Sequence, residues 1–167
     1  MRVPREFTGR EEAAVVFSFD CPASGELQAV RKLSDLPIRK PSVQGLLRTA
    51  ATLAGQDELG ALHAYECAHR IHPCEPAVLI ALARFRLDAR DERLRDAKQA
   101  VSLAREAVRL THAQNAACLD TLARALHANG TLIEAAAYAR QAADQNPYDE
   151  DAAARAQAFA KELGNRK

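Results

Sequence analysis

The sequence predicts an all-α protein built from stacked, antiparallel helix pairs. Composition is the first indication: about a fifth of the 167 residues are alanine, aromatic residues make up 5% and tryptophan is absent, a balance that favours closely packed helices over sheets. The second indication is a series of helix-start and helix-stop signals at short intervals after Pro41. The third is a spacing of small residues that recurs in three of the expected helices.

Residues 1–41 differ from the rest of the chain and are predicted to form an N-terminal arm. This segment is interrupted by four prolines, Pro4, Pro22, Pro37 and Pro41. It leaves room for an extended piece over residues 13–19 and a helical turn or two over 25–34. The apolar run of residues 13–19, AAVVFSF, is expected to be covered. Packing on the first repeat is favoured, and the alternative is the groove of the same or a second molecule, which would allow a homodimer through the arm.

Seven helices are predicted after the arm, each starting at a capping residue or proline and stopping at a glycine, proline or polar turn. Their expected bounds are 42–55, 57–72, 76–88, 97–112, 115–129, 131–146 and 149–163. Ser42 is expected to cap the first helix, and Gly130 to take a left-handed conformation after the fifth. Thr131 and Glu134 have the spacing of a capping box for the sixth helix. Gly164 is expected to end the last one.

Three of these helices share one template, in which four positions, mostly alanine, are separated by four, three and five residues. The matching residues are Ala61, Tyr65, Ala68 and Pro73 in the second helix, Ala100, Ala104, Ala107 and His112 in the fourth, and Ala135, Ala139, Ala142 and Pro147 in the sixth. Separations of three and four keep residues on one helix face, where alanines let neighbouring axes come close. The chain is therefore predicted to form repeats at about 42–75, 76–115 and 116–149, and a capping helix at 149–163 would cover the end of the stack.

Residues 118–147, CLDTLARALHANGTLIEAAAYARQAADQNP, resemble the tetratricopeptide repeat (TPR). The resemblance includes the small residues, the glycine-containing turn and the closing proline, and it extends over about two thirds of the chain, within residues 42–167. There are three departures. The first unit, at about 42–75, fits well only in its second helix. The unit at 76–115 carries some five extra residues in its turn, and Leu79 and Leu119 stand where a large aromatic residue is common. The resemblance implies a short right-handed superhelix, or α-solenoid, whose first helices line a groove.

The resemblance also implies that the protein binds a peptide or helix of another protein in this groove. Groove positions carried onto this sequence are Gln44, Leu47, Arg48, Ala51, Ala77, Ile80, Arg84, Asp120, Arg124 and His127. The three arginines form either a cationic line or ordinary surface, so the expected partner segment is acidic or mixed apolar.

Some family members hold a chaperone's C-terminal carboxylate with a lysine and asparagine clamp, which these positions do not provide. The arm and three repeats also resemble the translocator chaperones of type III secretion, a narrower form of the adaptor function.

A metal- or redox-responsive protein is the competing class. Residues 63–74 contain five side chains of types that bind zinc, His63, Cys67, His69, His72 and Cys74. The neighbouring copy of the repeat, residues 137–147, has no ligand residues, so the template explains the helix without a metal. No metal and no other cofactor is expected.

Catalysis, nucleic-acid binding and membrane insertion are not expected. Cys118 with His112 or His127 is the conceivable nucleophile pair, but no orienting carboxylate or oxyanion loop accompanies it. The 23 basic and 22 acidic residues are interspersed, so no basic patch arises. The apolar run near the N-terminus is too short for a signal peptide or a spanning helix, and the four cysteines are interpreted as free thiols. A cytoplasmic protein is expected.

Overall fold

The structure, a computed structural model, describes residues 42–165. Over this range the chain forms seven α-helices and one short 3-10 helix, without strands. The all-α prediction is therefore confirmed. The expected arm, with its apolar run at 13–19, and residues 166–167 lie outside the described residues.

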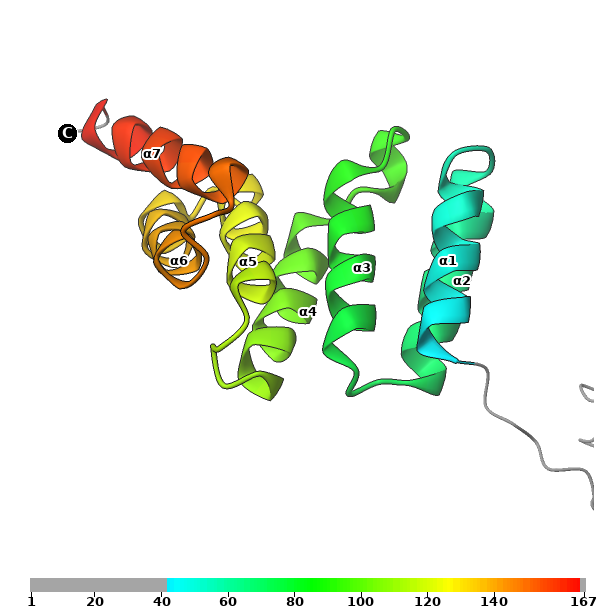
Figure 1. The fold of residues 1–167 in the computed structure, drawn as a ribbon. Coiled ribbons are helices and arrows are strands. Elements are labelled where there is room, and N and C mark those ends of the chain that lie inside the picture. Colours follow the sequence, from blue (N-terminus) through cyan, green and yellow to red (C-terminus); the bar gives the residue numbers. More distant parts are fainter. Residues whose placement is uncertain (1–41, 166–167) are drawn as a thin grey trace, which may run out of the picture. The chain divides into compact units, whose positions relative to one another are not determined.

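The helices follow one another with short connections (Figure 1). Their bounds are α1 Val43–Ala54, α2 Glu58–Ile71, α3 Pro76–Asp88, η3 Glu92–Leu94, α4 Ala97–Leu110, α5 Ala116–Ala128, α6 Leu132–Gln145 and α7 Glu150–Asn165. Each predicted helix is present, with its ends within two residues of the expected positions. The extra residues of the second repeat form the turn that contains η3.

Side-chain caps fix several helix starts. Ser42 Oγ accepts a hydrogen bond from Gly45 N at 3.2 Å, as predicted. Asp57, Asp96 and Asn115 accept equivalent bonds at the starts of α2, α4 and α5. At the end of α5, Gly130 has the predicted left-handed conformation, with a φ of 84°.

Two predicted terminal signals are wrong. Thr131 does not cap α6, because its Oγ1 donates to Leu126 O at 3.0 Å instead. Glu134 pairs with Arg105 of α4 at 2.9 Å, so the expected capping box does not form. α7 continues through Gly164, since glycine permits a left-handed turn without requiring one.

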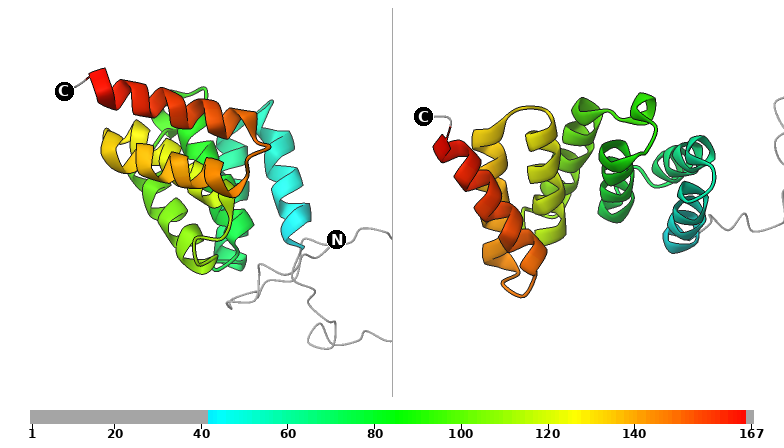
Figure 2. Two further views of the ribbon diagram at one scale, coloured as in Figure 1. Left: turned by 60° about the vertical axis from the view of Figure 1, so that its left-hand side comes forward. Right: turned by 90° about the horizontal axis from the view of Figure 1, so that it is seen from above.

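The helices pack as three pairs followed by a single helix. α1 contacts α2, α3 contacts α4, and α5 contacts α6. α7 packs on α6, at the end of the stack opposite α1 (Figures 1 and 2). The first helices α3 and α5 also contact each other directly. None of the helices between residues 42 and 165 is both long and apolar enough to cross a bilayer.

Alanines of the shared template are buried where the helices pack on one another. The template alanines of the second helices are at most 1% exposed: Ala61, Ala68, Ala100, Ala104, Ala107, Ala135, Ala139 and Ala142. Leucines of α3 and α5 fill the spaces beside them, and those with at most 1% exposure are Leu79, Leu82, Leu119, Leu122 and Leu126.

Candidate partner-binding groove

The first helices α1, α3 and α5 share one register, which a fully buried alanine marks in each. These alanines are Ala50, Ala83 and Ala123. The next residue is Ala51 in α1, Arg84 in α3 and Arg124 in α5. Two of the three predicted groove arginines therefore occupy equivalent positions.

Arg48 does not share that position. It lies two residues before the buried Ala50, where α3 has Ala81 and α5 has Thr121. The three arginines consequently do not form a line in one register. Arg48 is exposed on α1, at the end of the stack opposite α7.

An open pocket of about 500 Å³ lies on the exposed side of α3. It is lined by Tyr65 of α2, by Ala77, Ile80, Ala81, Arg84, Phe85 and Asp88 of α3, and by Ala117 of α5. Three predicted groove residues, Ala77, Ile80 and Arg84, thus meet in one hollow. Gln44 and Leu47 of α1 do not line it.

Two polar contacts join α3 to α5 beside this pocket. Arg84 Nε donates to Thr121 Oγ1 at 3.0 Å, and the buried Thr121 hydroxyl donates in turn to Ala117 O at 2.7 Å. Arg124 Nη2 donates to both carboxylate oxygens of Asp88, at 2.7 and 2.8 Å. Asp88 therefore neutralises Arg124, whereas a neutral hydroxyl anchors Arg84.

Two further polar contacts join α5 to α7. Arg155 Nε donates to Asp120 Oδ1 at 2.7 Å, and Asp120 is only 6% exposed. His127 Nε2 lies 2.9 Å from Glu162 Oε2, and its ring stacks on Phe159 with centroids 4.3 Å apart. The polar atoms of two predicted groove residues, Asp120 and His127, are thus bonded within the domain. We call these two contacts and the two between α3 and α5 the cross-repeat ladder.

The sequence analysis did not predict the partners of the groove residues in this ladder, which are Asp88, Thr121, Arg155, Phe159 and Glu162. The sequence did contain a signal for four of them, because the bonded pairs are 35 to 37 residues apart, close to one repeat length. A search for complementary polar residues one repeat apart would have found them.

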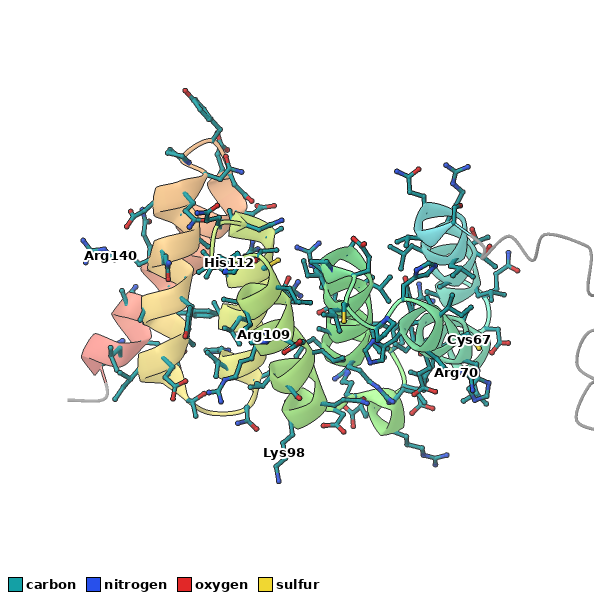
Figure 3. The ribbon with its side chains drawn as sticks, turned by 90° about the horizontal axis from the view of Figure 1, so that it is seen from below. Cys67, Arg70, Lys98, Arg109, His112 and Arg140 are labelled. Carbon is teal, nitrogen blue, oxygen red and sulfur yellow. The ribbon has the colours of Figure 1, made fainter. Side chains whose placement is uncertain are left out.

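The cysteine and histidine side chains of residues 63–74 do not form a set of metal ligands. Cys67 Sγ accepts a hydrogen bond from Arg70 Nη2 at 3.1 Å, on α2 (Figure 3). His63 and Cys74 are exposed, while His69 and His72 are half-buried. Within residues 42–165, no three His, Cys, Asp or Glu side chains gather where they could hold a metal ion.

Cys118 has the environment of a packing residue. It is fully buried in α5, and this burial raises the pKa of its thiol. A raised pKa disfavours the thiolate, which is the nucleophilic form.

Comparisons with known proteins identify the fold. No protein-family model and no curated protein matches the chain. Solved structures do match it. The first TPR domain of Spaghetti (RPAP3), bound to the HSP90 peptide SRMEEVD, is 18% identical with a TM-score of 0.63, covering 73% of this chain and 93% of that one.

Two other solved structures agree. The first TPR domain of human RPAP3 is 18% identical with a TM-score of 0.64, covering 74% of this chain and 93% of that one. The C-terminal TPR-containing domain of a Plasmodium falciparum protein assigned to the FK506-binding proteins is 17% identical with a TM-score of 0.58, covering 75% and 90%. The described part of this chain therefore has the fold of the tetratricopeptide repeat domains.

Proposed function

We propose that the protein is a protein–protein interaction module whose first helices form a groove for a segment of another protein. The observation that carries this proposal is the pocket on α3, where the exposed Ala77 and the half-buried Ile80 lie beside the arginine Arg84. Apolar surface with a few placed polar groups is typical of binding sites. A structure of the same fold, with a bound HSP90 peptide, gives further support.

The groove is proposed to extend from this pocket in both directions. Gln44, Leu47 and Arg48 would continue it along α1, and Arg124 would continue it along α5. The ladder residues of α5, Asp120 and His127, would form the wall nearest α7, because α7 already engages their polar atoms. This surface suits a mixed apolar or acidic segment.

The cellular role that fits this groove is that of a cytoplasmic adaptor. Cys67, Cys74 and Cys118 are free thiols, which suits a reducing compartment. A translocator chaperone is a special case, in which the bound segment belongs to an exported protein. The homodimer expected from residues 13–19 is tested separately by sedimentation of the full chain, where a monomer contradicts it.

Selection of short displayed peptides against the full chain tests the proposed function. Ala77→Arg places a long cation in the pocket and is expected to weaken binding of the selected peptides by at least about tenfold. Ala137→Arg makes the same change on the exposed side of α6 and should leave binding unchanged. Because both alanines are exposed, both variants should melt like the original chain. Failure to enrich any peptide, or equal binding by the two variants, contradicts the proposal.

A further inference from the structure

Arg84 lacks the carboxylate that its counterpart has. Arg84 and Arg124 occupy equivalent positions in α3 and α5, and Arg124 is bound by Asp88 from the preceding first helix. Counted from the buried alanine of each helix, the residue of α1 that corresponds to Asp88 is Gly55. α1 therefore offers no acidic side chain at this position, and Arg84 bonds to Thr121 of α5 instead.

The backbone does not require glycine at this position. Gly55 follows the last turn of α1 with φ −78° and ψ −20°, an ordinary right-handed conformation. A Cβ added there would meet only Thr52 O, at 3.7 Å, which is an ordinary van der Waals contact. Gly55 is exposed, so the place that Asp88 takes in the next repeat is open to solvent here.

Arg84 is held in place without being neutralised. Its Nε donates to the hydroxyl of Thr121, and among residues 42–165 no carboxylate pairs with its guanidinium group. The two Nη atoms keep N–H donors in the planar fork that matches two carboxylate oxygens. An anchored cation in the wall of an open pocket favours a ligand with a negative charge.

We infer that Arg84 binds one aspartate or glutamate side chain of the partner segment, which contacts Arg84 as Asp88 contacts Arg124. This inference rests on the proposed function, because it specifies the chemistry of the segment in that groove. The lining near Arg84 is apolar, through Ala77, Ile80 and Ala117, so the neighbours of the acidic residue are small and apolar.

A run of acidic residues does not fit this surface. Asp88 already binds Arg124 and Asp120 already binds Arg155, so within residues 42–165 neither of these two arginines is left to pair with additional carboxylates of a ligand. A side chain suits the site better than a chain terminus, because the pocket extends along α3 on both sides of Arg84, from Ala77 to Asp88. A segment can therefore continue past the arginine in both directions.

Supplying the missing carboxylate from the chain itself tests the inference. Gly55→Asp should compete with the acidic residue of the selected peptides and weaken their binding by at least about tenfold. Gly55→Asn has the same size without the charge and should leave binding unchanged. Arg84→Gln should weaken binding to a similar extent, and adding Gly55→Asp to it should have no further effect. The control is Arg140→Gln, because Arg140 projects from the outer side of α6 (Figure 3) and should not affect binding.

Two peptide libraries separate the sources of the carboxylate. In one, random peptides are fused to a carrier through their C-termini, so only side-chain carboxylates are available; in the other, the C-termini are free. The fused library is expected to enrich peptides with one acidic residue among small apolar ones, and Arg84→Gln should remove that preference. Three outcomes would overturn the inference. The enriched peptides could share no acidic residue, they could come from the free-terminus library alone, or Arg84→Gln could bind them as the original chain does.

Those three outcomes leave the proposed function standing, provided that Ala77→Arg still weakens binding of the enriched peptides by at least about tenfold. Failure to enrich from either library overturns both. Melting curves for every variant verify the fold. If Gly55→Asp unfolds the chain, Arg84→Gln alone decides the outcome.

Discussion

At the scale of single residues, alanine determines how closely the helices approach. Ala142 of α6 is fully buried, while Ala137 of the same helix is exposed. Replacing Ala142 by leucine is expected to lower the free energy of unfolding by about 1–3 kcal/mol, because a close-packed contact cannot house the added carbon atoms. Ala137→Leu should change it by no more than about 0.5 kcal/mol. Denaturant unfolding compares the two, and equal costs would show that α6 packs through a different face.

Glu58 of α2 helps to fix the long turn of the second repeat. Its two carboxylate oxygens accept the backbone N–H groups of Arg90 and Asp91, each at 2.8 Å. These two hydrogen bonds lower the pKa of Glu58 below its ordinary value. The carboxylate form is therefore the one that holds the turn against α2.

The lowered pKa makes the role of Glu58 dependent on pH. A carboxyl group with a lower pKa in the folded chain stabilises that chain above its ordinary pKa, and the effect is lost as the pH falls through the lowered value. Glu58→Gln should therefore melt below the original chain at neutral pH, and the difference should shrink below about pH 4. Asp144→Asn, at the exposed end of α6, is the control. A difference that does not depend on pH would contradict this role.

At the scale of elements, the sequence predicts the helix bounds, because residues at the helix ends determine them. The helix at Pro76–Asp88 was predicted to the residue, since a proline starts it and the charged turn ends it. Thr131 shows the limit of these helix-start signals. Its hydroxyl donates a hydrogen bond to a backbone carbonyl of the preceding helix and does not cap α6. The contacts of Asp88 and Arg155 depend on how successive repeats face each other, which local patterns do not specify.

The prediction that α7 caps the stack can be tested on the whole element. Phe159 is 9% exposed and stacks on His127, and Arg155 of the same helix is bonded to the buried Asp120. Deleting the chain after Asn146 should lower the free energy of unfolding by about 1.5–3 kcal/mol from Phe159 alone. The exposed ends of α5 and α6 should also promote aggregation.

Thermal unfolding with light scattering measures both effects of the deletion. Lys161→Gln, on the exposed side of α7, is the control and should melt like the original chain. A truncated chain that melts at the original temperature would show that α7 does not cap the stack.

At the scale of the whole described stack, the repeats are joined unevenly. The cross-repeat ladder links α3 to α5 and α5 to α7. Between α1 and α3, within residues 42–165, no side-chain hydrogen bond or ion pair is formed, and Ala50 is the one buried residue of α1. The first pair is held mainly through α2, where Glu66 pairs with Arg86 at 2.9 Å and Tyr65 packs on Phe85 with ring centroids 5.4 Å apart.

This unevenness predicts the order in which the stack opens. The stability of stacked repeats is the sum of terms for each repeat and for each interface, so the pair with the weakest interface opens first. Amide hydrogens of α1 should therefore exchange faster than those of α3 to α6. Tyr65→Ala should speed amide exchange in α1 and α2 and leave that of α7 unchanged. Phe159→Ala should speed exchange in α7 and leave that of α1 and α2 unchanged. If both variants loosened all helices alike, the described stack would unfold as a single cooperative unit.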